Sequence, residues 1–96
     1  MKYSLIAAGL LGIVVSISTI AGQAEYDNCI LEHLKDAKLD DATRLIKQAC
    51  DENYKDTSFT SDKQRSYNNC LLEHLVGVES IRAIIEIKTA CSRKFK

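Results

Sequence analysis

Four cysteines, placed as two pairs with one spacing, constrain the fold of this 96-residue chain more than any other feature. Cys29 and Cys50 are 21 positions apart, and Cys70 and Cys91 repeat that separation. A chain of this length buries too small a core to be stable through hydrophobic contacts alone. Disulfide bonds are the usual reinforcement of small exported domains. The spacing therefore predicts a covalently stapled fold with two equivalent staples.

The segment around each cysteine pair is itself repeated. The sequence "YDNCILEHL", which begins at Tyr26, returns 41 positions later as "YNNCLLEHL". Residues 26–55 and 67–96 align without a gap and are identical at 13 of 30 positions, which include both cysteines and the Glu-His pair. So dense a match indicates internal duplication, and we expect two copies of one structural unit.

The N-terminus has the pattern of a secretory signal peptide. One positive charge, Lys2, precedes an apolar run from Leu5 to Ile20, and the small residues Gly22 and Ala24 have the spacing that a signal peptidase recognises. We expect cleavage after Ala24, so that the mature chain begins at Glu25. The alternative is that the run stays uncleaved as a membrane anchor, because about 18 apolar residues can span a bilayer.

Export would place the cysteines in an oxidising compartment, the periplasm or the exterior of the cell, where paired thiols form disulfides. Removal of the signal takes away Lys2 and leaves 12 basic against 13 acidic side chains. This balance favours neither nucleic-acid binding nor electrostatic adhesion to anionic lipid. We therefore expect no nucleic-acid partner and no stable membrane insertion after cleavage.

Each unit has the pattern of a helical hairpin. Apolar residues of the first unit recur at steps of three and four on both sides of the polar segment "KLDDA". Antiparallel helices bring residues at equal distances from a turn side by side, and the cysteines of each unit meet this condition. We therefore predict the bridges Cys29–Cys50 and Cys70–Cys91. Duplication supports this pairing, because a single ancestral unit with two cysteines could complete its own bridge.

Capping residues indicate the helix boundaries. Asp40 or Asp41 is expected to cap the second helix of the first unit. In the second unit Gly77 can end one helix, and Ser80 is expected to cap the next.

The predicted organisation is all-α, with two tandem disulfide-stapled hairpins. The connection between the units is polar, and Ser61 and Gln64 have the spacing of a capping box, so a helix is expected to begin near Asp62. The expected segments are a signal peptide (1–24), a first hairpin (25–55), a partly helical linker (56–66) and a second hairpin (67–96), with residues 25–96 in one compact domain.

The second unit resembles a recurrent segment of small exported bacterial proteins. The shared features are the start "YNNC", the turn "GVES" and the ending "AC", which basic residues and an aromatic follow. Two copies after a signal peptide are similar to a family of short bacterial proteins with four cysteines. The resemblance covers the mature chain except its linker, and it implies export and the hairpin fold but no activity. The first unit has "DAKLDD" at the turn, which we expect to be built differently.

A histidine follows the first cysteine of each unit by four positions, which places both side chains on one side of a helix. With oxidised cysteines, the histidines are expected to pack beside the bridges, and neither a metal nor a cofactor is expected. The alternative is a periplasmic metal-binding protein that uses Cys29, His33, Cys70 and His74 in the reduced state to hold zinc or copper.

The sequence contains no pattern typical of an active site. Glu32 and Glu73 each precede a histidine, but adjacent helical positions diverge by about 100°, so the two side chains should not converge on one substrate. The chain also lacks a Cys-x-x-Cys redox motif and a Gly-rich phosphate loop. We expect a protein without catalytic activity that is periplasmic or secreted and acts as a binding or accessory module. A secreted toxin or inhibitor is the remaining alternative.

The last helix of the second unit carries more apolar surface than its counterpart. The first unit has polar residues at three positions where the second has Ile81, Ile84 and Ile85. These residues widen the apolar arc to roughly 220° of the helix. The surplus is expected either to pack against the first unit or to form a binding face for a protein partner. The sequence leaves open the identity of that partner and the oligomeric state of the protein itself.

Overall fold

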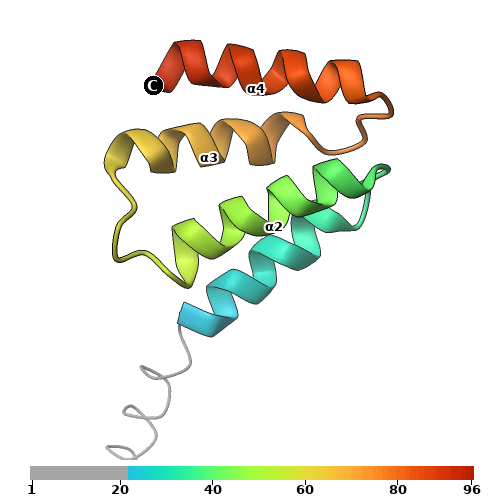
Figure 1. The fold of residues 1–96 in the computed structure, drawn as a ribbon. Coiled ribbons are helices and arrows are strands. Elements are labelled where there is room, and N and C mark those ends of the chain that lie inside the picture. The colour runs from blue at the N-terminus through green and yellow to red at the C-terminus, as the bar shows by residue number, and fades with distance from the viewer. Residues whose placement is uncertain (1–21) are drawn as a thin grey trace, which may run out of the picture.

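The computed structural model describes residues 22–96, and this part of the chain is all-helical. It contains a first helix (22–34), α2 (Asp40–Tyr54), α3 (Asp62–His74) and α4 (Ile81–Phe95), as Figure 1 shows. Among these helices, none combines the length and the apolar character needed to cross a membrane. The predicted signal peptide and the alternative membrane anchor lie outside the described residues, except for residues 22–24, which belong to the first helix.

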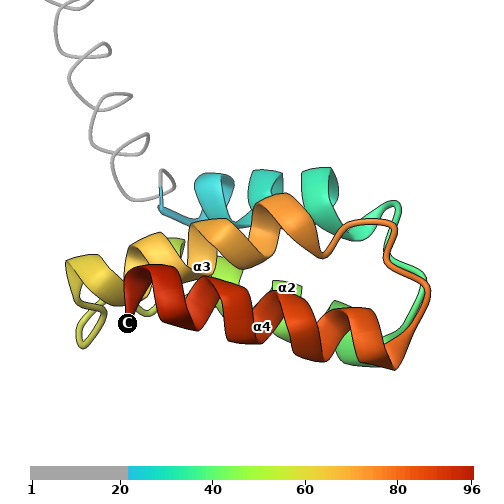
Figure 2. The same cartoon turned by 90° about the horizontal axis from the view of Figure 1, so that it is seen from above.

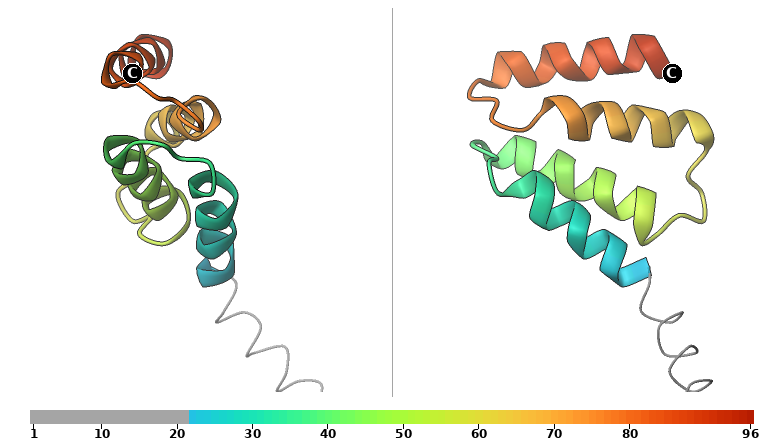
Figure 3. Two further views of the ribbon diagram at one scale, coloured as in Figure 1. Left: turned by 90° about the vertical axis from the view of Figure 1, so that its right-hand side faces the viewer. Right: turned by 180° about the vertical axis from the view of Figure 1, so that it is seen from behind.

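The helices form two antiparallel hairpins, as the repeat predicts. The first helix pairs with α2, α3 pairs with α4, and α3 also packs against α2. The end-on view in Figure 3 shows the helices staggered in two layers, with the first helix and α3 in one layer and α2 and α4 in the other. Figure 2 shows the same layers from above. Because successive helices are antiparallel, α2 and α4 run in the same direction on one face of the molecule.

One disulfide joins the two helices of each hairpin. Cys29 on the first helix bonds Cys50 on α2, and Cys70 on α3 bonds Cys91 on α4, with a Cα–Cα distance of 5.8 Å in both bridges. The predicted pairing is therefore confirmed. Each bridge closes a loop that the chain-entropy model values at roughly 3 kcal/mol. The bridges also indicate an oxidising, extracytoplasmic compartment.

Two helices begin where the capping pattern predicts. The Ser61 hydroxyl accepts a 3.0 Å hydrogen bond from the backbone N–H of Gln64, and the Ser80 hydroxyl accepts one of 3.0 Å from Ala83. α3 accordingly begins at Asp62, inside the segment that was expected to be a partly helical linker. Each serine oxygen thus satisfies one of the orphan N–H groups of a helix N-terminus.

The turn of the first hairpin is built differently from that of the second. The N-cap of α2 is Leu39, whose side chain makes no capping hydrogen bond, so the prediction that Asp40 or Asp41 caps this helix was wrong. Both aspartates lie within the first turn, where their charge interacts favourably with the positive end of the helix dipole. In the second hairpin Gly77 has a φ of 78°, a left-handed conformation that glycine adopts without a steric penalty.

The core lies between the layers and continues through both hairpins. Its buried apolar side chains come from all four helices and are Cys29, Ala42, Leu45, Ile46, Ala49, Cys50, Leu71, Leu72, Leu75, Ile84 and Cys91. Because these residues form one cluster, the two hairpins share a single hydrophobic core.

A cation–π contact closes the open end of each hairpin. Lys55 Nζ lies 4.9 Å from the ring centroid of Tyr26, and Lys96 Nζ lies 4.4 Å from that of Tyr67. The first tyrosine and the last lysine of each unit thus meet in both copies. Such contacts each contribute about 0.5–1 kcal/mol at exposed sites.

Candidate binding groove between α2 and α4

A groove of about 260 Å³ lies between α2 and α4, and α3 forms its floor. All three helices and the C-cap of α4 contribute polar side chains to it, which are Gln48, Glu52, Gln64, Tyr67, Asn68, Lys88 and Lys96. A second hollow of about 340 Å³ adjoins the groove and shares Tyr67 and Lys88 with it. This face of the molecule is therefore hollowed along α4. We call the first of the two hollows, between α2 and α4, the α2–α4 groove.

A network of side-chain hydrogen bonds fixes the floor of the groove. Asn68 Nδ2 donates to Oε1 of Glu52 and to Oδ1 of Asn53, at 3.0 Å in both cases. Gln64 Nε2 donates to Oδ1 of Asn68 at 2.9 Å and to Oε1 of Glu52 at 3.3 Å. Asn53 Nδ2 completes the network with a 2.9 Å bond to Oδ1 of Asn69. Among residues 22–96, every buried side-chain nitrogen or oxygen has a partner, so the network holds α2 and α3 in one register.

Sequence reasoning missed this network. Asn53 and Asn68 are polar, so an apolar periodicity assigns them to the surface, yet both are buried. Tyr54, which continues the apolar periodicity of α2, is instead exposed. The available signal was an exchange within the repeat, because Asn68 stands where the first unit has Asp27.

Tyr67 lies at the end of the groove where the charged side chains gather, close to the Glu52 carboxylate and the Lys96 ammonium group. Burial raises the pKa of its phenol, and the negative charge of Glu52 raises it further. Lys96 lies over its ring, and Lys88 lines the groove beside it. This end therefore presents two ammonium groups around a neutral phenol, while the Glu52 carboxylate already accepts hydrogen bonds from three side-chain amides.

The predicted isoleucine face divides between core and surface. Ile84 is only 4% exposed and belongs to the core, whereas Ile81 is 49% exposed and Ile85 is 53% exposed. Ile81, Ile85 and Lys88 follow one another at helical spacing along one side of α4. Lys88 lines the groove, and the two exposed isoleucines lie outside its lining, on the same side of α4 as Lys88 and nearer the N-terminus of that helix.

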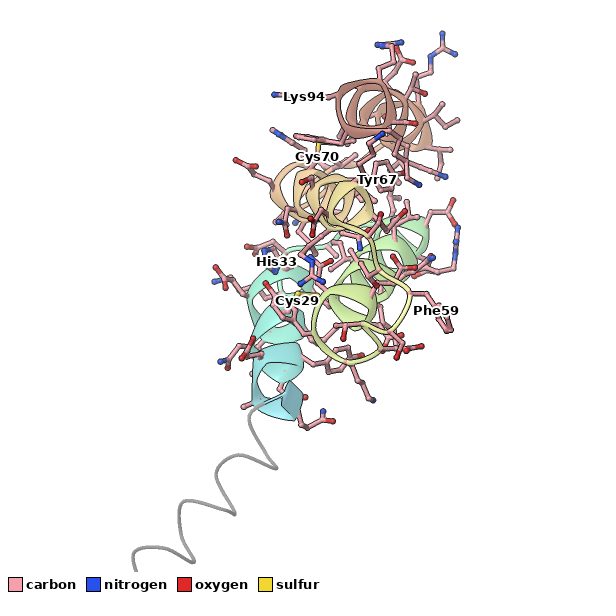
Figure 4. The ribbon with its side chains drawn as sticks, turned by 90° about the vertical axis from the view of Figure 1, so that its left-hand side faces the viewer. Cys29, His33, Phe59, Tyr67, Cys70 and Lys94 are labelled. Carbon is pink, nitrogen blue, oxygen red and sulfur yellow. A yellow bond between two sulfur atoms is a disulfide. The ribbon has the colours of Figure 1, made fainter. Side chains whose placement is uncertain are left out.

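The residues of the metal-site hypothesis lie in two sets, one in each hairpin. Figure 4 shows Cys29 and His33 on the first helix and Cys70 on α3, in the other hairpin. Within the described part of the chain, the one group of three or more potential ligands consists of Cys29, His33 and Cys50, whose ligand atoms lie within 4.8 Å of one another. Both of its sulfurs are in the disulfide, and Nδ1–H of His33 donates to the carbonyl oxygen of Cys29 at 2.8 Å. His74 is exposed at the end of α3.

The duplicated Glu-His segment lines one shallow pocket in each hairpin. The two pockets have volumes of about 210 Å³ each and lie at equivalent positions beside the disulfides. Glu32 and His33 border the first and Glu73 and His74 the second. Each pocket also has one aromatic ring in its lining, Tyr54 in the first and Phe95 in the second.

Comparison with known proteins places the chain in a family. The family model described as four-cysteine protein VF_A0006-like matches residues 7–95, which is nearly the whole chain. The chain therefore belongs to that family, and the resemblance seen in its repeated cysteine segment is confirmed. No curated protein and no solved structure matches it.

Proposed function

We propose that this member of the four-cysteine protein VF_A0006-like family is an exported, non-catalytic binding protein, periplasmic or secreted, that takes an acidic amphipathic segment of a partner protein into the α2–α4 groove. One observation supports the proposal: the half-exposed Ile81 and Ile85 and then Lys88 and Lys96 follow one another along the same side of the molecule. An occupant complementary to this arrangement has an apolar part followed by carboxylates.

The apolar end supplies the non-specific part of the binding free energy. Ile81 and Ile85 each leave about half of the side chain in water. Covering the remaining surface of such a residue contributes roughly 1 kcal/mol, since complete burial of an isoleucine contributes about 1.5–3 kcal/mol. Two adjacent isoleucines on one helix can therefore anchor an apolar helix face in the partner.

The polar end supplies direction and selectivity. Lys88 and Lys96 line the groove, whereas its carboxylate, Glu52, is held by amide donors from the floor. A partner carboxylate placed between the lysines gains charge complementarity, and a partner lysine meets like charge. The orientation of the occupant follows, with its apolar part at the N-terminus of α4 and its acidic part beyond Lys88.

The walls of the groove are held rigidly before any partner arrives. α2 is bound to the first helix through Cys50, and α4 is bound to α3 through Cys91. The amide network fixes α2 against α3. A preorganised groove loses little conformational entropy on binding, so most of the interaction free energy appears as affinity.

The test uses two synthetic amphipathic helical peptides that share one apolar face and carry either glutamates or lysines on the polar side. Calorimetric titration of the oxidised, mature protein should show binding of the acidic peptide and little binding of the basic one. Lys88→Glu should weaken the acidic peptide by about tenfold or more. The matched control is Lys47→Glu, because Lys47 is exposed and holds the same position in the first unit.

Equal binding of the two peptides would refute the assignment of an acidic occupant. Equal losses in Lys88→Glu and Lys47→Glu would show that net charge, rather than the groove, determines binding. Retained binding in Ile85→Asp would remove the apolar end from the site.

A further inference from the structure

Two identical residues of the repeat have opposite environments. Leu72 on α3 is 4% exposed, whereas Leu31, at the equivalent position of the first helix, is 70% exposed. Leu72 is buried because α3 packs on α2, the last helix of the preceding hairpin. No described hairpin precedes the first helix, so its corresponding face lies open to solvent.

The junction between α2 and α3 shows what such a face binds. α3 presents Asn68 and Leu72, and α2 presents Ala49, Glu52 and Asn53, of which Ala49 and Asn53 are buried. The polar contacts run from the Asn68 amide to both Glu52 and Asn53. The polar part of the junction is thus one amide donor on α3 set against two acceptors on α2, and both helices add buried apolar side chains to one core, Leu72 and Ala49 among them.

The open face of the first helix already has the conformation of the buried one. Gln23 Nε2 donates to Oδ1 of Asp27 at 3.0 Å, and this bond repeats the 2.9 Å bond from Gln64 to Asn68. Leu31 follows Asp27 by one helical turn, as Leu72 follows Asn68. Cleavage after Ala24 would remove Gln23 and this bond, but it would leave both Asp27 and Leu31 in the mature chain, so the contact proposed below uses only these two residues of the face.

The outward face of α4 is the open counterpart at the other end of the molecule. Ala90, Arg93 and Lys94 stand where α2 has Ala49, Glu52 and Asn53, and all three are exposed. The exchanges at the two ends are complementary in charge. The first helix has the carboxylate of Asp27 where α3 has the Asn68 amide, and α4 has the cations Arg93 and Lys94 where α2 has two hydrogen-bond acceptors. The small residue that permits close approach is an alanine in both cases.

We propose that copies of this chain associate head to tail, with the first helix of one copy packed on α4 of the next in the manner in which α3 packs on α2. The ion pairs of this contact join Asp27 to Arg93 and Lys94, and Leu31 covers Ala90. The charges of the whole units agree, because residues 26–55 carry five basic against seven acidic side chains and residues 67–96 carry five against three.

The contact is heterologous, so each added copy leaves one first helix and one α4 face free. It is also weaker than the internal junction, because Glu86 stands where α2 has the buried Leu45, and because exposed ion pairs contribute little each. Association should therefore depend on protein concentration and decrease as salt screens the charges.

The experiment is sedimentation velocity of the oxidised, mature protein over a wide concentration range, together with two variants blocked at opposite ends. Leu31→Asp blocks the first helix, and the double variant Arg93→Glu with Lys94→Glu blocks α4. Each variant alone should lose self-association, because the contact needs an intact first helix and an intact α4 face, and every copy of one variant lacks the same one of these two surfaces. An equimolar mixture should form one-to-one dimers and stop there, since each partner supplies one intact end.

Three results would overturn the proposal. The unmodified protein could remain monomeric at every concentration, or the α4 variant could associate as well as the unmodified one, which would indicate symmetric pairing of first helices. The mixture could also fail to dimerise although both variants retain the helical circular dichroism and melting temperature of the parent. Because no residue of the first helix lines the groove, Leu31→Asp should still bind the acidic peptide, so the two proposals fail independently.

Discussion

The side-chain amide of Asn68 donates a 3.0 Å hydrogen bond to Oδ1 of Asn53, and both residues are buried where the two hairpins meet. The same amide donates to Glu52 at 3.0 Å. A buried polar contact of this kind is stabilising only while every member keeps its partner. The register between the hairpins therefore depends on the amide character of one residue.

Exchange of Asn68 for the residue of the first repeat tests this dependence. Asn68→Asp removes the donor to Glu52 and Asn53 and places a second carboxylate in a buried site. We expect a loss of about 3 kcal/mol or more in the free energy of unfolding at neutral pH, measured by denaturant unfolding. The reverse exchange, Asp27→Asn, lies at an exposed position and should change stability by less than about 0.5 kcal/mol. Similar changes in both variants would contradict the account of the junction.

Adjacent isoleucines on α4 should respond differently to the same substitution. Ile84→Asp places a charge in the core, and we expect a loss of more than about 3 kcal/mol or failure to fold. Ile85→Asp changes a residue that is half exposed, so its melting temperature should remain close to that of the parent, while binding of the acidic peptide is lost. Thermal unfolding followed by circular dichroism measures the difference. Equal destabilisation by the two substitutions would mean that Ile85 belongs to the core.

The phenol of Tyr67 makes stability depend on pH in the alkaline range. Burial, and next the charge of Glu52, raise its pKa above the ordinary value of 10.0. The folded state therefore holds the proton more tightly than the unfolded state, and the associated stability is complete below the ordinary pKa and is lost as pH rises through the raised one. Glu52→Gln should lower the pKa of Tyr67 partway toward 10.0, measured from tyrosinate absorbance as the difference from Tyr67→Phe. A pKa unchanged by this substitution would exclude a contribution from Glu52.

The hairpins and their bridges follow from local sequence patterns. The 21-residue separation of the cysteines, the capping serines Ser61 and Ser80 and the apolar steps of three and four each concern residues of one helix or one hairpin, and the structure contains all of these features. The misassigned cap of α2 shows the limit of such patterns. Asp40 and Asp41 satisfy the preference for acidic residues at a helix start, but Leu39 holds the cap because the helix begins one residue earlier than that preference suggests.

Features that depend on packing between units were not accessible from local patterns. Leu31 and Leu72 are the same letter in the same repeat position, and only the stacking of a second hairpin distinguishes their exposure. The burial of Asn53 and Asn68 likewise arises from partners about 15 positions away in the chain. The groove shares this origin, since its walls come from α2 and α4, which belong to different hairpins.

The groove, the junction and the open faces all depend on the pairing of the cysteines, because each is formed by helices of hairpins that one bridge closes. Proteolysis of the non-reduced, exported protein followed by mass spectrometry measures this pairing directly. The predicted result is one linked peptide pair that contains Cys29 and Cys50 and another that contains Cys70 and Cys91. Peptides that link Cys29 to Cys70 or to Cys91 would contradict the two-hairpin architecture.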